Sequence, residues 1–169
     1  MGRDVVEVAE FSAFVAASQT RMVRLAELLT GDRGRAEDLA QHGFAQAYAA
    51  WRRIRNGEPD AYVRRCIVNA HTDWWRRRSW REQPFAIMPE QPSVCDTAAA
   101  LADREMVLRA LGRLTARERL VLVLRFYLDM SEIDIAAELD IAPGTVKSAA
   151  SRGLAKLRSD AELLAERIA

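Results

Sequence analysis

MSEIDIAAELDIAPGTVKSAASRGLAKL, residues 130–157, holds two helix signals on either side of a very short turn. The first predicted helix starts at Ser131, whose hydroxyl can cap the amide of Asp134 while that carboxylate reaches back in a capping box. Pro143 marks the start of a second helix, because its fixed φ suits the first helical turn and its missing N–H costs nothing there. The stretch therefore predicts a helix-turn-helix.

The second helix of this stretch has two different faces. Its predicted buried face contains Val146, Ala150, Leu154 and Leu157. Its polar face carries hydroxyl, amine and guanidinium groups from Thr145, Lys147, Ser148, Ser151, Arg152 and Lys156. These groups bond phosphates and base edges, so we predict that this face enters a DNA groove. A short helical hairpin with a solvated outer face is the alternative.

Basic residues are unevenly distributed, although the net charge of the 169 residues is only +1. Residues 51–81 contain nine arginines against three acids, a surplus of six, whereas acids outnumber bases from residue 90 to residue 140. Such a basic block is either a solubilising face or a nucleic-acid surface, depending on how its arginines are arranged.

Composition excludes several classes of protein. Half of the residues are hydrophobic, so the chain can bury a core, yet no run approaches the ~18 apolar residues of a membrane span. The amino terminus lacks the layout of a secretory signal, so we expect a cytoplasmic protein without membrane insertion.

Cys66 and Cys95 have no partner at ligand spacing, so we predict no metal, cofactor or disulfide. Without a phosphate loop or a histidine beside a nucleophile, we predict no catalytic residue, no small-molecule substrate and no enzyme.

Periodic apolar residues predict three helices in the first half of the chain. The first covers residues 10–30, and the second runs from about residue 32 to residue 54, with Gly43 indicating close helix approach. The pattern restarts at Pro59 in a third helix, which we expect to reach about residue 80.

The third of these helices also has two stripes. The predicted buried stripe contains Val63, Cys66, Ile67, Ala70 and Trp74. The other stripe mixes polar, charged and aromatic side chains: Arg65, Asn69, Asp73, Arg76, Arg77 and Trp80. Amides, guanidinium groups and aromatic rings bind phosphates and unstacked bases. Tryptophans that close a small core beside solvated arginines are the alternative.

Residues 83–100 contain three prolines and no sustained periodicity, so we predict a linker. It separates a first domain, residues 1–82, from a second, residues 101–169. The second domain begins with a helix over residues 101–112.

A further helix then opens with a capping box of Thr115 and Glu118. This helix is so apolar between Leu120 and Leu128 that we expect it to be nearly enclosed. A strand over VLVL is the alternative, which the capped start and the length disfavour. The predicted fold class is all-α, with a short helical tail after Leu157 and no appended sensory domain.

Three motifs follow one another along nearly the whole chain. They are GRAEDLAQHGFAQAY at residues 34–48, NAHTDWWRRR at 69–78 and RERLVLVLRFYLDMSEIDIAAELDIAPGTVKSAASRGLAKLR at 117–158. In this order the chain resembles the extracytoplasmic-function class of bacterial sigma factors, the sigma-70 family subunits that give RNA polymerase promoter specificity. The resemblance implies a sigma-2 bundle of three to four helices and a sigma-4 helix-turn-helix domain, joined by a flexible linker.

The resemblance also implies partners and roles. The first motif would bind the clamp of the largest subunit of core RNA polymerase through Asp38, Leu39, Gln41, His42 and Phe44. The second would read and open the minus-10 element of promoter DNA through Arg65, Asn69, Asp73, Arg76, Arg77 and Trp80, with a flipped base captured by the loop of residues 55–60. The third would read the minus-35 element through Thr145, Lys147, Ser148, Ser151, Arg152 and Lys156.

The resemblance implies one more partner, the flap of the second-largest polymerase subunit, and leaves open whether an anti-sigma factor binds the chain. Three positions depart from the family pattern. His42 stands where many members carry an acid, Asp140 where a turn glycine is usual, and Ala149 where a basic residue is common.

Two functions follow from these observations. The first is a sigma factor that binds core polymerase and directs promoter-specific initiation. The alternative is an autonomous repressor or activator that uses only the helix-turn-helix, while the first domain senses a ligand or forms a dimer.

Overall fold

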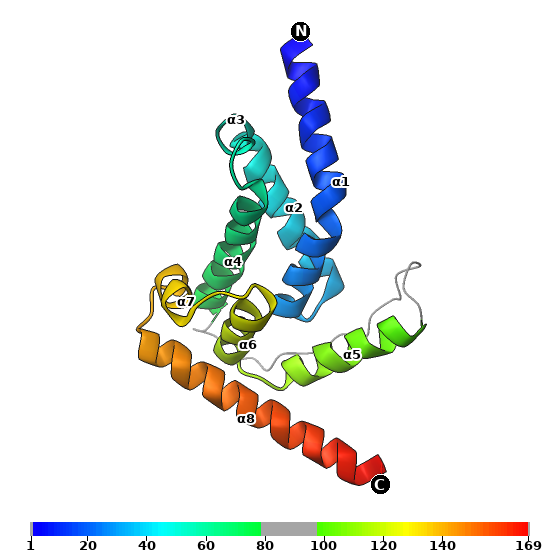
Figure 1. Cartoon of the computed structure of the whole chain (residues 1–169), viewed down its shortest axis with the longest axis vertical. Helices are drawn as coiled ribbons and strands as arrows, with labels where there is room; N and C mark the ends of the chain where they lie inside the picture. Colours follow the sequence, from blue (N-terminus) through cyan, green and yellow to red (C-terminus); the bar gives the residue numbers. More distant parts are fainter. Residues whose placement is uncertain (1, 79–97, 169) are drawn as a thin grey trace. The chain divides into compact units, whose positions relative to one another are not determined.

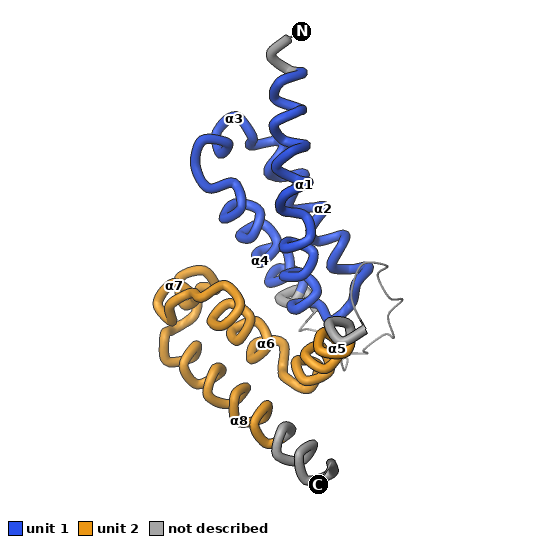
Figure 2. The backbone as a smooth tube through the Cα atoms, turned by 45° about the vertical axis from the view of Figure 1, so that its right-hand side comes forward, with its two compact units in different colours: residues 1–82 blue, residues 83–169 orange. Residues whose placement is uncertain are grey.

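A computed structural model of the chain describes residues 2–78 and 98–168 (Figure 1). The chain divides into two compact units, Met1–Glu82 and Gln83–Ala169 (Figure 2). All regular structure in the described residues is helical, which confirms the predicted all-α class. The predicted linker lies outside the described residues as far as residue 97, and its last three positions already belong to helix α5.

The first unit contains, in its described part, α1 (Gly2–Thr30), α2 (Arg33–Ala49), α3 (Trp51–Ile54) and α4 (Pro59–Arg78). Both α1 and α4 pack against α2 (Figure 2). Gly31, at φ 68°, ends α1, and Asp32 then caps α2 by accepting a 2.7 Å hydrogen bond from the Arg35 N–H. As predicted, Pro59 begins the long helix α4.

Small residues bring α2 close to its neighbours. Its fully or nearly fully buried face consists of Ala36, Ala40, Gly43, Phe44 and Ala47. A Cβ added at Gly43 would lie 3.1 Å from Ile67 Cγ1 and 3.3 Å from the Val63 carbonyl oxygen of α4. The predicted close approach at Gly43 is thus confirmed.

An aromatic cluster joins α1 to the end of α2 and to α3. The Trp51 ring lies 5.1 Å from Phe11 and 5.3 Å from Phe14, between ring centroids. The prediction of one helix over residues 32–54 is wrong, because the chain leaves helical geometry at Ala50 (φ −99°, ψ 3°). This break places Trp51 in a separate short helix, α3, where its ring is buried in the cluster.

The described part of the second unit contains α5 (Ala98–Gly112), α6 (Ala116–Leu122), a π-helical turn (Val123–Tyr127), α7 (Glu132–Leu139) and α8 (Pro143–Ile168). The last two helices form the predicted helix-turn-helix, with Pro143 at the start of α8. The fully buried core of this unit includes Val121 of α6, Leu124 of the π-helical turn, Ile135 of α7 and Val146 of α8.

Two expectations about burial in this unit are wrong. The helix after Thr115 is enclosed only as far as Leu124, because the π-helical turn leaves Phe126 63% and Tyr127 40% exposed. The inner face of α8 uses Ala149 and Gly153 beside Val146, whereas the residues predicted to line it, Ala150, Leu154 and Leu157, are only partly buried.

Two of the departures from the family pattern lie in the helix-turn-helix, one at the end of α7 and one on the inner face of α8. Asp140 adopts a left-handed conformation (φ 52°, ψ 52°) at the end of α7, which a glycine would adopt without strain. Ala149 is fully buried, so a basic side chain at this position would have to leave the core.

Both predicted helix caps are present, with one difference in detail. Thr115 and Glu118 form a complete capping box. Ser131 caps Asp134, but that carboxylate accepts a 2.6 Å bond from the Ser131 hydroxyl instead of reaching the backbone N–H. None of the helices within residues 2–78 and 98–168 has the length and apolar character needed to cross a bilayer.

Candidate nucleic-acid interface

The outer face of α4 presents one line of polar side chains. Arg65, Asn69 and Asp73 are exposed and follow one another every four residues, opposite the buried Val63 and Ile67. Of the other predicted members of this stripe, Arg76 and Arg77 belong to the last turns of α4, but their side chains lie outside the described residues, as does Trp80. The described half of the stripe is therefore accessible to a ligand.

Two partly buried side chains near this stripe serve the core. Trp74 packs under the Arg35 guanidinium, whose carbon lies 3.9 Å from the ring centroid. Burial raises the pKa of the Cys66 thiol, and Tyr62 and Arg65 oppose that shift. Cys66 is half-buried, as expected of a small residue at the core's edge.

The loop of residues 55–60 is held to α1 at both ends. At its start, Arg55 Nη1 lies 2.9 Å from Glu10 Oε2. At its end, Asp60 Oδ1 accepts hydrogen bonds from Ser18 Oγ at 2.9 Å and from Arg21 Nη2 at 2.8 Å. Between these contacts residues 56–58 are exposed. The sequence did not predict these contacts, which join residues about forty positions apart.

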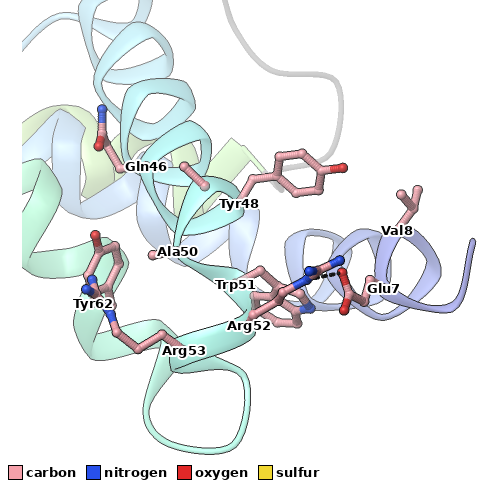
Figure 3. Close-up of a pocket in the computed structure, with 10 residues that line it drawn as sticks. Glu7, Val8, Gln46, Tyr48, Ala50, Trp51, Arg52, Arg53 and Tyr62 are labelled. Atoms are coloured by element: carbon pink, nitrogen blue, oxygen red, sulfur yellow. Dashed lines mark hydrogen bonds and ion pairs between the residues drawn. The ribbon is translucent and has the colours of Figure 1, made fainter. Parts of the chain in front are cut away.

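A hollow of about 530 Å³ lies beside the same loop (Figure 3). It is lined by Glu7, Val8, Gln46, Tyr48, Ala49, Ala50, Trp51, Arg52, Arg53 and Tyr62. Figure 3 shows Tyr62 and Arg53 at one end, and at the other the ion pair of Arg52 with Glu7, whose Nε and Oε2 atoms are 3.0 Å apart.

The predicted polymerase-binding residues occupy two different environments on α2. Asp38, Gln41 and His42 are exposed and lie on one face, because their spacings of three and four bring them together. Leu39 is partly buried. Phe44 is only 8% exposed and packs edge-on against Phe14 at 6.0 Å, so the structure places it in the core of the unit.

The polar face of α8 is present as predicted. Its outward-facing members are Lys147, Ser148, Ser151, Arg152 and Lys156, all exposed, together with the partly buried Thr145. Ser148 donates a hydrogen bond to the Thr145 carbonyl oxygen at 3.1 Å, as a serine on a helix commonly does. This face lies opposite Val146 and Ala149, which fix α8 on the core.

Sequence reasoning missed a buried acid beside this face, although it recognised the same residue as a cap. The side chain of Glu118 is 5% exposed, and its Oε2 lies 2.8 Å from Lys156 Nζ. Its Oε1 lies 3.8 Å from Arg152 Nε. Burial raises the pKa of the Glu118 carboxyl, but the bonds from Lys156 and Thr115 outweigh this effect and hold the pKa below its ordinary value. Glu118 is therefore a carboxylate at neutral pH.

The neighbouring Arg119 is buried as well, at 3% exposure. Burial lowers its pKa to about 10, which leaves the guanidinium charged at neutral pH.

Both units match known sigma-factor sequences. Sigma-70 region 2 matches residues 14–81, and Sigma-70 region 4 matches residues 104–157. The RNA polymerase sigma-E factor of Streptomyces coelicolor is 39% identical over 155 residues, which cover 91% of this chain and 87% of that protein. The ECF RNA polymerase sigma factor SigL of Mycobacterium tuberculosis is 32% identical over 131 residues, 74% of this chain and 73% of SigL.

Solved structures share the fold. The sigma factor RpoE of Bartonella quintana, in complex with the anti-sigma factor NepR, superposes with a TM-score of 0.63 at 20% identity, covering 88% of this chain and 94% of that one. CnrH, in complex with the cytosolic domain of CnrY, gives a TM-score of 0.58 at 24% identity, with 90% and 88% coverage. The matched regions and the coverage of its relatives show that this chain belongs to the extracytoplasmic-function RNA polymerase sigma factors of the sigma-70 family.

Proposed function

We propose that this protein binds core RNA polymerase in the cytoplasm and directs it to specific promoters, with no chemistry of its own. The observation that carries the proposal is that each of two separate helical units exposes a polar stripe suited to DNA, on α4 and on α8. Family membership supports the same function, because the relatives are named as RNA polymerase sigma factors.

The first unit would read the minus-10 element. Arg65, Asn69 and Asp73 of α4 supply guanidinium, amide and carboxylate groups, and Arg76 and Arg77 follow on the same helix. Opening DNA costs a few kcal/mol per unstacked step, so a protein without ATP must bind the extruded base better than the duplex does. The loop of residues 55–60, held to α1 at both ends with residues 56–58 exposed between, supports capture of that base.

The second unit would read the minus-35 element as duplex DNA. Thr145, Lys147, Ser148, Ser151 and Arg152 stand on the outward face of α8, the second helix of the helix-turn-helix. In this motif the second helix lies in the major groove and its first residues contact base edges. A single side-chain contact of this kind is worth ~1 to 3 kcal/mol of discrimination between bases.

Two surfaces would contact the polymerase. On α2, exposed Asp38, Gln41 and His42 suit a polar contact with the clamp of the largest subunit, whereas the buried Phe44 would support that face from inside. On the second unit, Phe126 and Ile133 are 63% and 73% exposed, and such apolar side chains suit the flap of the second-largest subunit.

An anti-sigma factor is a further partner that we propose. It is supported by the titles of the two similar structures, which describe a sigma factor with the anti-sigma factor NepR, and CnrH with CnrY. If the chain is purified from its own cells under mild conditions, a co-purifying protein should inhibit transcription when it is added back. Absence of any inhibitory protein would contradict this part of the proposal.

Gel filtration with and without core polymerase separates the proposed function from the autonomous repressor. A sigma factor should elute with the polymerase as a single complex. A stable free dimer that ignores the polymerase would favour the repressor, because such proteins bind palindromic sites as dimers. The pair Asp38→Ala and Gln41→Ala should reduce co-elution, with exposed Gln46→Ala of the same helix as the control.

A further inference from the structure

Glu118 connects the start of α6 to the DNA-facing helix α8 across 38 residues of sequence. Its Oε2 accepts a 2.9 Å bond from the Thr115 N–H and a 2.8 Å bond from Lys156 Nζ. Its own N–H bonds to the Thr115 hydroxyl at 3.3 Å. The carboxylate is thus both a helix cap and the ion-pair partner of a cation that the sequence assigned to DNA.

Close packing fixes this contact. Gly153 lies on the inner face of α8, where an added Cβ would be 2.8 Å from Leu122 Cδ1 and 3.4 Å from Glu118 Cβ. The two helices therefore approach closely at this point, and Glu118 has little room to move. Its side chain is 5% exposed with Lys156 in place, so a departing ammonium group would leave the carboxylate without its hydrogen-bonded cation.

The two cations near Glu118 differ in how strongly they are held. Lys156 forms a direct hydrogen bond, whereas Arg152 Nε is 3.8 Å away and its side chain is 63% exposed. Arg152 can therefore turn toward DNA without leaving a buried charge unpaired. If Lys156 turned toward a phosphate, it would give up the direct hydrogen bond that neutralises the buried carboxylate, which costs stability.

We propose that Glu118 determines which cations of α8 act on DNA: it retains Lys156, so that Lys147 and Arg152 contact phosphates and Lys156 does not. The proposal rests on the proposed function, since it requires α8 to bind DNA, and it revises the sequence-based role of Lys156. Phosphate contacts contribute the sequence-independent part of the binding free energy, and fewer of them make this part smaller. The base contacts of α8 then contribute a larger share of the total.

The test is the salt dependence of DNA binding by the full-length chain, measured by fluorescence anisotropy with a short labelled duplex of mixed sequence. Each lost phosphate contact reduces the slope of log affinity against log salt by ~0.9. Lys156→Gln should leave the slope unchanged, and Lys147→Gln should reduce it by ~0.9. Glu118→Gln should raise it by ~0.9, because Lys156 is released, and adding Lys156→Gln to that variant should cancel the gain.

Two controls separate the outcomes. Glu105→Gln removes the same charge from the same unit, at an exposed position of α5 that pairs with Arg109 and not with a cation of α8, and should not change the slope. Circular dichroism must show an unchanged helix content for every variant. A slope reduced by ~0.9 in Lys156→Gln, or unchanged in Glu118→Gln, would overturn the proposal. If Lys147→Gln has no effect, α8 is not the DNA interface, and the proposed reading of the minus-35 element fails with it.

Discussion

The two units of this protein neutralise their arginines and lysines in different ways. In the first unit, Arg52 and Arg55 pair with Glu7 and Glu10 at 3.0 and 2.9 Å, and all four side chains are partly or largely exposed. In the second unit, Lys156 pairs with Glu118, which is buried. Exposed pairs contribute ~0 to 1 kcal/mol, whereas breaking a buried pair by removing one partner costs several times more.

This difference relates to function. The exposed pairs of the first unit can exchange a carboxylate for a phosphate at little cost, which is compatible with the DNA contacts proposed for this unit. The buried pair of the second unit is part of the fold, so it limits which cations bind DNA. The pairs made by Glu7 and Glu10 are therefore adjustable, whereas the pair made by Glu118 is structural.

Replacement of Glu118 should give the largest effect. Glu118→Ala removes both the cap of α6 and the partner of Lys156, so the free energy of unfolding of the second unit should fall by about 3 kcal/mol. All four tryptophans precede residue 83, so their fluorescence follows only the first unit, whereas circular dichroism follows both. In urea, the dichroism should therefore develop an early transition while the fluorescence midpoint stays in place. An equal shift of both signals would mean that the units do not unfold independently.

Overpacking of the first unit should destabilise that unit, which the tryptophan fluorescence follows. Gly43→Val places methyl groups against Ile67 and the Val63 carbonyl, where even a Cβ lies within 3.3 Å, and should cost about 2 kcal/mol. Here the fluorescence midpoint should move to lower urea. Ala45→Val, on the exposed side of the same helix, is the matched control and should cost less than about 1 kcal/mol. Similar losses for both variants would refute close packing at Gly43.

Acid should weaken the second unit through Glu118. The pKa of this carboxyl is lower in the folded chain than its ordinary value of 4.5, so its stabilisation is present above that pH. It is lost as the pH falls from 4.5 toward the folded-state pKa, since the unfolded chain then binds the proton more tightly. Urea titrations monitored by dichroism should show a weaker pH dependence for Glu118→Gln than for the parent chain. Identical pH profiles would remove Glu118 as a source of acid sensitivity.

The exposed pairs should give the smallest effect. Glu7→Gln removes the partner of Arg52 at the surface and should change the stability of the first unit by at most about 0.5 kcal/mol, less in high salt. Tryptophan fluorescence in urea at low and high salt measures this directly. A loss comparable to that of Glu118→Ala would contradict the distinction between the two units.

Local signals were predictable from the sequence. The caps at Thr115 and Ser131, the helix start at Pro143 and the close approach at Gly43 depend on residues whose chemistry acts within one or two turns. The exposed positions of Asn69 and Arg152 follow from helical periodicity alone.

Features that depend on distant residues were not predictable. Periodicity gave no indication that the helix would end at Ala50, where Trp51 packs on Phe11 and Phe14 of α1, about forty residues earlier in the chain. The pairing of Glu118 with Lys156 joins two helices, so neither local pattern contains it. The core position of Phe44 likewise depends on Phe14 of α1.

The most direct test of the account is run-off transcription with purified core polymerase on a pool of genomic promoters. The full-length chain should produce transcripts from a limited set of start sites that core polymerase alone does not use. Asn69→Ala with Arg77→Ala should abolish these transcripts while the variant still co-elutes with the polymerase. If the unaltered chain yields no start-site-specific transcripts, or if the variant transcribes normally, the account of α4 as the promoter-opening helix is contradicted.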